Sequence, residues 1–215
     1  MKTEKGRQTL LQNYRRRKGE IESRLLHFES IGKKGGPALF EELAFCILTP
    51  QSKAFSCDSA IKELKQKGLL HKGNTRQISG VLSKKTRFHN KKAEYLVAAR
   101  EKFSKDGFES LKEATFHGTE KEAREVLLKL VKGIGWKEAS HYLRNVGRGK
   151  TIAILDRHIL KNLEKHGVIR MPKTLTKKRY LEIEKKMGKF CREIGIPMPH
   201  LDLLLWAEET GRVFK

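Results

Sequence analysis

Lys137 and Asp156 are the two residues of this sequence whose types and positions best suit covalent chemistry. Lys137 falls in the first turn of an expected helix, where the positive end of the helix dipole disfavours a cation and favours the neutral, nucleophilic amine. Asp156 follows 19 positions later (156 − 137), at the expected start of another helix, where a carboxylate can stabilise positive charge. The alternatives are a solvated or phosphate-binding lysine and an aspartate that only caps its helix.

A four-residue connection directly before this lysine, Lys132 to Gly135, predicts a tight helix hairpin. Gly133 and Gly135 permit a turn that larger residues would obstruct, and Ile134 provides an apolar plug between them. The free N–H groups at the start of the second helix, together with Lys132, form a site for a DNA phosphate that reads no bases. The alternative is an ordinary helix corner with a glycine cap.

Helical periodicity dominates the rest of the chain and predicts an all-α fold. The expected helices cover about 11–28, 37–48, 54–67, 90–103, 121–131, 136–146, 157–167, 177–194 and 199–210. Gly and Asn predict a loop region over 73–80, and residues 151–155 form a short extended apolar run. Val126 is expected on the apolar face of its helix, together with Ala123 and Leu127.

The charge of the chain indicates a polyanionic partner, and nucleic acid is the commonest one. The sequence holds 47 Lys and Arg against 25 Asp and Glu, a net charge of +22 that exceeds what solubility requires. No apolar run reaches the ~20 residues of a membrane helix, and the N-terminus lacks the apolar core of a secretory signal. We therefore expect a cytoplasmic, nucleoid-associated monomer that makes no membrane contact.

The cysteine and histidine residues predict neither a disulfide framework nor a metal site. Cys46, Cys57 and Cys191 lie too far apart for the spacing of zinc or iron–sulfur ligands, and the eight His residues form no metal-binding pattern. Cys46 and Cys57 are expected to be small buried hydrophobic residues. No metal and no cofactor is expected in the chemistry.

Two segments together, LLKLVKGIGWKEAS and LDRHIL, resemble the helix-hairpin-helix DNA glycosylase superfamily. The resemblance implies that Lys137 attacks the sugar C1′ of an extruded nucleotide, that Asp156 assists, and that β-elimination then nicks the strand. Members that only remove the base carry another residue at the lysine position, so Lys137 implies a combined glycosylase and lyase. The sequence departs from the family at Lys132, where a proline is frequent.

The segments AFCILTPQSKAF, KGIGWKEASHYLRNVG and LLLWAEETG extend this resemblance, from about residue 37 onward, to the compact second type of 8-oxoguanine DNA glycosylase. That type implies stacking of the damaged guanine between Trp206 and Phe88, contact of the base by Lys215 with its free carboxylate, and filling of the vacated space by Gln51. On pattern alone, Trp206 is more typical of a core residue and Gln51 of turn chemistry. The chain has no room for an extra β-domain and lacks a four-Cys cluster.

The resulting hypothesis is a two-subdomain enzyme that acts on double-stranded DNA with 8-oxoguanine or abasic sites. Residues 1–36 with 150–215 would form one helical subdomain carrying Asp156, and 37–149 the other, carrying the hairpin and Lys137, with the active site in the cleft between them. Alternatives are a glycosylase/lyase for another damaged base, a non-catalytic helix-hairpin-helix DNA-binding protein, and a basic RNA-binding protein.

Overall fold

The computed structural model describes the backbone of residues 2–215, and this part of the chain is helical without strands. Its helices are α1 (Lys2–Lys33), α2 (Gly36–Leu48), α3 (Ala54–Gln66), α4 (Leu69–Lys72), α5 (Thr75–Leu82), α6 (His89–Phe103), α7 (Glu109–Phe116), α8 (Glu120–Leu130), α9 (Trp136–Asn145), α10 (Arg157–Lys165), α11 (Lys177–Ile194) and α12 (Met198–Thr210). A 3-10 turn over Ser104–Asp106 follows α6. The predicted all-α fold class is confirmed.

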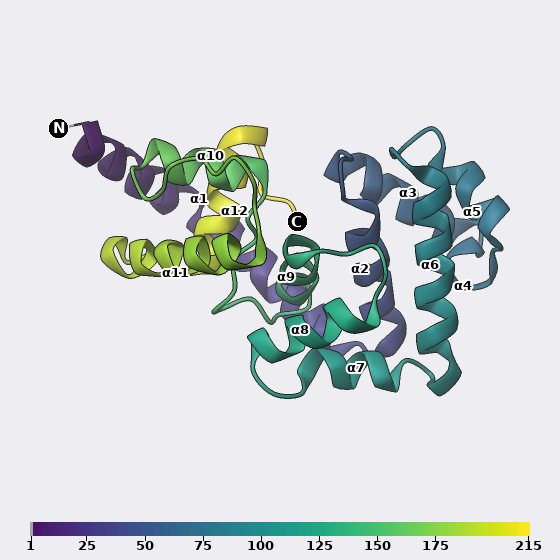
Figure 1. Cartoon of the computed structure of the whole chain (residues 1–215). Coiled ribbons are helices and arrows are strands. Elements are labelled where there is room, and N and C mark those ends of the chain that lie inside the picture. Colours follow the sequence, from purple (N-terminus) through teal and green to yellow (C-terminus); the bar gives the residue numbers. More distant parts are fainter. Residues whose placement is uncertain (1) are drawn as a thin grey trace.

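The helices form two groups that meet around α8 and α9 (Figure 1). On one side α12 packs against α1, α10 and α11; on the other side α2 packs against α3, α6 and α7. The helix α9 contacts both α1 and α2, so it lies where the two groups join. The subdomain boundaries predicted from the sequence, at residues 36 and 149, remain a prediction.

The central helix α2 explains why the right-hand group in Figure 1 is compact. Its sequence, GPALFEELAFCIL, is apolar on nearly every side, and most of its residues are buried. Pro37 lies in its first turn, where the missing N–H of proline costs no hydrogen bond. A helix that is apolar all round must be surrounded by other helices, and α1, α3, α6, α7 and α9 all pack against it here.

Three helices occur where none was predicted, and one of them, α4, has only four residues. The helix α5 fills most of the stretch 73–80 that was expected to be a loop, because Asn74 and Gln77 form a reciprocal capping box that starts it. The helix α7 is only eight residues long, too short to give a clear periodic signal. Val126 was also assigned wrongly: it is 39% exposed, and Arg124 occupies the buried face beside Ala123 and Leu127 instead.

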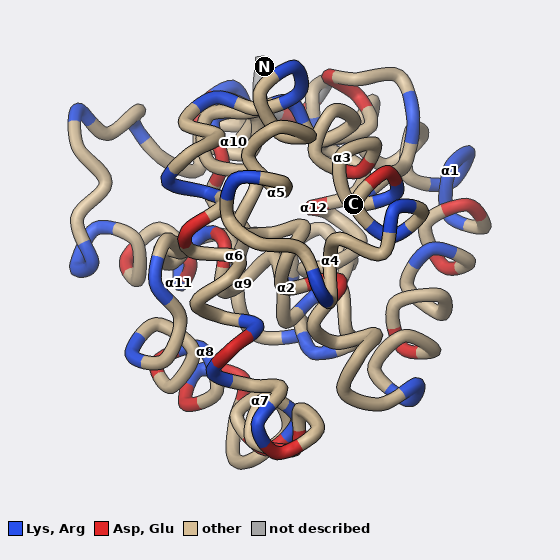
Figure 2. The backbone as a smooth tube through the Cα atoms, turned by 90° about the vertical axis from the view of Figure 1, so that its right-hand side faces the viewer, with Lys and Arg blue, Asp and Glu red and all other residues tan. Residues whose placement is uncertain are grey.

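Basic residues occur on nearly every helix and on the connecting loops (Figure 2). They are interspersed with fewer acidic residues, in keeping with the net charge of +22. Among the described residues, no helix combines the length and the apolar character that a membrane crossing requires.

Candidate active site

The hairpin between α8 and α9 is as tight as the sequence predicts, but its two glycines contribute differently. Gly133 has a φ of 87°, in the left-handed region, and a β-carbon there would collide with the ring of Tyr95. Gly135 is the N-cap of α9 with a φ of −110°, which any residue can adopt. Ile134 is half-buried against the core, and Lys132 is exposed. The requirement for glycine therefore rests on Gly133.

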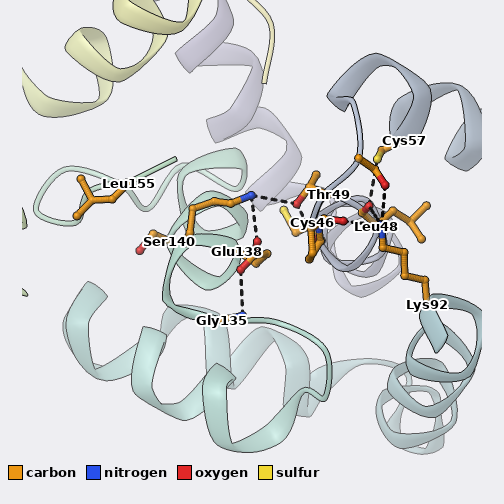
Figure 3. Close-up of polar contacts among 12 residues, drawn as sticks. Cys46, Leu48, Thr49, Cys57, Lys92, Gly135, Glu138, Ser140 and Leu155 are labelled. Atoms are coloured by element: carbon orange, nitrogen blue, oxygen red, sulfur yellow. Dashed lines mark hydrogen bonds and ion pairs between the residues drawn. The ribbon is translucent and has the colours of Figure 1, made fainter. Parts of the chain in front are cut away.

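Lys137 lies in the first turn of α9, and its ammonium has two polar neighbours (Figure 3). Its Nζ is 3.0 Å from Oε1 of Glu138 and 3.4 Å from Oγ1 of Thr49, which caps the end of α2. The side chain is 24% exposed, so the amine is partly enclosed but reachable. The sequence predicted this position for Lys137 but gave no sign of the contact with Glu138.

Asp156 is the N-cap of α10, as predicted. Its Oδ1 accepts a hydrogen bond of 2.8 Å from the backbone N–H of Ile159, which fixes the carboxylate at the helix start. No hydrogen bond or ion pair joins Asp156 to Lys137 in the described part of the chain. Both residues nevertheless influence the pKa of Asp202 on α12, so the two lie around the same carboxyl group.

A buried network that the sequence did not reveal holds the segment in front of Asp156. Glu184 on α11 pairs with Arg124 on α8 through two contacts, of 2.5 Å and 2.9 Å, and also accepts the N–H of Ala153 at 2.8 Å. Tyr180 donates to the carbonyl of Ala153 at 2.6 Å. Arg124 further lies over the ring of Trp136, the residue before Lys137. One ion pair thus connects the surroundings of Lys137 and Asp156.

Gln51 and Phe88 are both exposed and both have a left-handed backbone, with φ values of 53° and 57°. Non-glycine residues adopt this conformation only where their surroundings enforce it. The enforcing residue is Lys92, whose buried ammonium donates to the carbonyls of Leu48 and Pro50 and to Oγ of Ser52 at 2.7–2.8 Å (Figure 3). Ser52 in turn accepts the N–H of Arg87, next to Phe88.

Trp206 is half-buried in an aromatic cluster rather than in the core. Its ring centroid lies 5.7 Å from that of Phe55 and 6.0 Å from that of Phe214. Phe88 is 55% exposed and contacts Arg87. Within residues 6–215 no ring contact joins Phe88 to Trp206, so the two predicted stacking partners do not touch one another.

Lys215 reaches into the interior between α2 and α3. Its ammonium pairs with Glu42 at 2.9 Å and with Asp58 at 3.1 Å, and it lies 4.4 Å from the ring centre of Phe45. Burial opposes the charge, but the two carboxylates raise the pKa of Lys215 overall. Lys215 and Lys137 both lower the pKa of His141 on α9, which places the two lysines around the same ring.

Several buried titratable groups surround the nucleophile candidate. Burial raises the pKa of Asp202 to about 6, although its partner Arg144 at 3.5 Å opposes the shift. Burial also raises the pKa of the Cys57 thiol to about 11 and that of the Cys46 thiol well above its ordinary value, which keeps both thiols protonated. Both cysteines are buried as predicted, and neither is a nucleophile at neutral pH.

A cavity of about 1330 Å³ lies elsewhere, among α1, α8, α11 and the start of α12, and it includes neither Lys137 nor Asp156. In the described residues, no group of three or more His, Cys, Asp and Glu side chains is arranged to hold a metal ion. The chemistry open to this site is attack by the Lys137 amine, with nearby carboxylates that can accept a proton or stabilise a cation.

Comparison with known proteins identifies one family throughout. The sequence model of a family described as 8-oxoguanine DNA glycosylase matches residues 21–196. A protein of Fusobacterium nucleatum described as 8-oxoguanine DNA glycosylase/AP lyase is 48% identical over 206 residues, which cover 94% of each chain. The crystal structure of the 8-oxoguanine DNA glycosylase of Thermotoga maritima matches with a TM-score of 0.88 and 35% identity, covering 99% of this chain and 100% of that chain.

A further solved structure contains DNA. It is the Methanocaldococcus jannaschii 8-oxoguanine glycosylase/lyase in complex with a 15mer DNA containing 8-oxoguanine. It matches with a TM-score of 0.84 and 36% identity, covering 96% of this chain and 100% of that chain.

Proposed function

This chain belongs to the 8-oxoguanine DNA glycosylase family, and on that premise we propose that Lys137 is its nucleophile and Asp156 the carboxylate that assists it. The protein is an 8-oxoguanine DNA glycosylase/AP lyase, which removes 8-oxoguanine from DNA and cleaves the strand at the abasic site. The observation that carries the residue assignment is the position of Lys137: a half-enclosed amine at a helix start, directly behind a tight hairpin.

The proposed reaction has two stages. The neutral Lys137 amine attacks C1′ of the extruded nucleotide, and the bond from C1′ to the base breaks as Asp156 stabilises the positive charge on the sugar. Opening of the sugar ring leaves an imine between Lys137 and C1′. Loss of a proton from C2′ and of the 3′ phosphate then nicks the strand, and hydrolysis of the imine frees the lysine.

The assignment of the base pocket follows from the same premise. We propose that Trp206 and Phe88 provide the stacking faces for 8-oxoguanine, that Lys215 contacts the base, and that Gln51 fills the space it vacates. The exposed, left-handed backbone at Gln51 and Phe88 supports this, because strained conformations persist where they serve a site.

The hairpin and the two helix groups complete the proposal. Lys132 and the backbone at Gly133 and Gly135 bind a phosphate of the damaged strand. The cleft that receives the nucleotide lies between the helical subdomain 37–149 and the subdomain formed by 1–36 with 150–215. We further propose that the protein is a monomer that associates with the nucleoid, since a charge of +22 favours DNA of any sequence.

Trapping with borohydride tests the nucleophile. The reagent reduces the imine, so the wild-type protein should form a covalent adduct with duplex DNA containing 8-oxoguanine or a preformed abasic site. Lys137→Gln should form none on either substrate, whereas Lys102→Gln, at an exposed lysine of α6, should match the wild type. An adduct in Lys137→Gln would refute the assignment of this lysine. Adducts restricted to an oxidised pyrimidine would instead indicate another base specificity.

A further inference from the structure

Glu138, the residue after Lys137, places one carboxylate against both the nucleophile and the hairpin (Figure 3). Its Oε1 is 3.0 Å from Nζ of Lys137, and its Oε2 accepts the backbone N–H of Gly135 at 3.0 Å. The Glu138 side chain is 11% exposed. A carboxylate that is buried and held at both oxygens has little freedom to turn away from the amine.

Among the carboxylates around Lys137, Glu138 is the one whose oxygen touches the ammonium. One carboxylate oxygen of Asp156 caps α10, and Asp156 makes no direct contact with Lys137. Asp202 is paired with Arg144. A proton moves directly only between groups within hydrogen-bond reach of one another. The carboxylate within that reach of Lys137 is therefore Glu138.

We propose that Glu138 is a catalytic residue, the general base that takes the proton from Lys137. The inference rests on the proposed role of Lys137 as nucleophile. One proton passes from the Lys137 ammonium to the Glu138 carboxylate, which leaves a neutral amine with a free electron pair and a neutral carboxylic acid. The electron pair forms the bond to C1′, and the electrons of the bond from C1′ to the base leave with the base. The acid can return its proton when the imine is hydrolysed.

This role assigns Asp156 to the sugar and Glu138 to the amine. Asp156 stabilises the charge on the sugar, while Glu138 prepares the attacking group, so the two carboxylates act in succession. The other titratable groups around Lys137 and Glu138 come from α2, α3, α6, α9, α12 and the C-terminal segment. They are Cys46, Cys57, Lys92, His141, Asp202 and Lys215. The thiols are protonated at neutral pH, so neither competes with Glu138 for the proton.

A purely structural role for Glu138 is the competing explanation, because its carboxylate also accepts the N–H of Gly135 at the start of α9. Glu138→Gln separates the two roles: the amide oxygen still accepts the Gly135 N–H, whereas the charge and the proton acceptor are lost. The chain offers a matched control in Glu122, which likewise stands at the third position of its helix, α8, accepts the N–H of the N-cap residue Thr119 and makes no described contact with a lysine.

The experiment measures single-turnover excision of 8-oxoguanine and borohydride trapping on a preformed abasic duplex, from pH 7 to pH 9. Glu138→Gln should slow both steps about 100-fold at pH 7, the usual order for loss of a general base. The deficit should shrink toward pH 9, where hydroxide replaces the carboxylate. DNA binding and melting temperature should stay at the wild-type values, and Glu122→Gln should match the wild type throughout.

Three results would overturn the inference. Wild-type rates in Glu138→Gln would show that Glu138 only caps the start of α9. Faster rates would mean that Glu138 only holds Lys137 in its charged form, and a deficit independent of pH would exclude proton transfer. If Lys137→Gln abolishes the adduct while Glu138→Gln is normal, the proposed function stands and this inference fails; an adduct in Lys137→Gln removes the premise itself.

Discussion

His141 shows how strongly single residues near Lys137 are affected by burial. It lies one turn after Lys137, its ring is fully enclosed, and Phe45 contacts it edge-on at 5.6 Å between ring centroids. Burial lowers the pKa of His141 far below 6.5, and the charges of Arg144, Lys137 and Lys215 act in the same direction. The folded protein therefore holds a neutral imidazole, whereas the unfolded chain takes up a proton below pH 6.5.

This difference predicts an acid-sensitive fold. A pKa lowered by folding contributes stability above pH 6.5, and that contribution is lost as the pH falls, by up to ~1.4 kcal/mol per pH unit. Urea unfolding measures this as the decrease in the free energy of unfolding from pH 7.5 to pH 5.5. This decrease should be smaller for His141→Phe than for the wild type. The control His117→Phe, at an exposed histidine, should lose as much as the wild type. Equal losses in all three proteins would contradict this origin.

At the scale of residues, the sequence identified the candidate site residues whose role follows from their place within a single helix. Lys137 in a first helical turn and Asp156 as a cap are local properties, and both helix positions were predicted. The contact of Glu138 with Lys137 depends on how these two side chains are oriented on α9. The pairing of Arg124 with Glu184 joins residues 60 positions apart. No local pattern encodes such contacts, so these residues were missed.

At the scale of elements, the turn between α2 and α3 depends on a single buried cation from α6. Lys92 is 4% exposed, and burial lowers its pKa. Its three hydrogen bonds hold the turn that carries Gln51, and the bond from Arg87 to Ser52 connects that turn to Phe88. The two exposed residues therefore keep a fixed relative position.

Lys92→Met should release this turn. Leu48, Pro50 and Ser52 lose the ammonium that donates to them, and the left-handed backbone at Gln51 is no longer enforced. We expect single-turnover excision of 8-oxoguanine to slow by at least tenfold, and trapping on a preformed abasic site to slow less, because that substrate has no base to extrude. The matched control is Lys91→Met, since Lys91 is exposed and pairs with Glu94 on the surface of α6. Equal slowing of both reactions would contradict a role in base extrusion.

The helices themselves were predicted well where their periodic pattern is long. The bounds of α11 agree with the prediction, and those of α12 differ by one residue. The short helices α5 and α7 were missed because packing, rather than intrinsic propensity, stabilises helices of eight residues. The buried face of α8 was predicted wrongly because it contains Arg124. Sequence patterns assign a charged residue to the solvent-facing side of a helix unless its buried partner is known.

At the scale of the whole molecule, the charge of +22 predicts DNA binding that depends strongly on salt. Affinity for duplex DNA should fall by at least 100-fold between 50 and 200 mM salt, as expected when several phosphate contacts release counterions. Lys132→Ala, at the hairpin, should weaken binding of damaged and undamaged duplexes equally and reduce the slope of log K against log salt by about 1. Fluorescence anisotropy titrations over this salt range measure both quantities. A loss confined to damaged DNA would contradict phosphate binding by Lys132.

The packing of the first helix on the last one has a consequence for how the protein is made. Tyr14 on α1 contacts His200 on α12 at 3.0 Å, and Asn13 contacts Glu208 at 2.6 Å. Until α12 has been synthesised, a chain growing on the ribosome leaves exposed the part of α1 that α12 covers, whereas α2 to α9 already have one another as partners. The contact of Lys137 with Thr49 can therefore form before the surroundings of Asp156 are complete, because the helix α10 that Asp156 caps packs against α12. Translation itself sets the order in which the two halves of the site come into being.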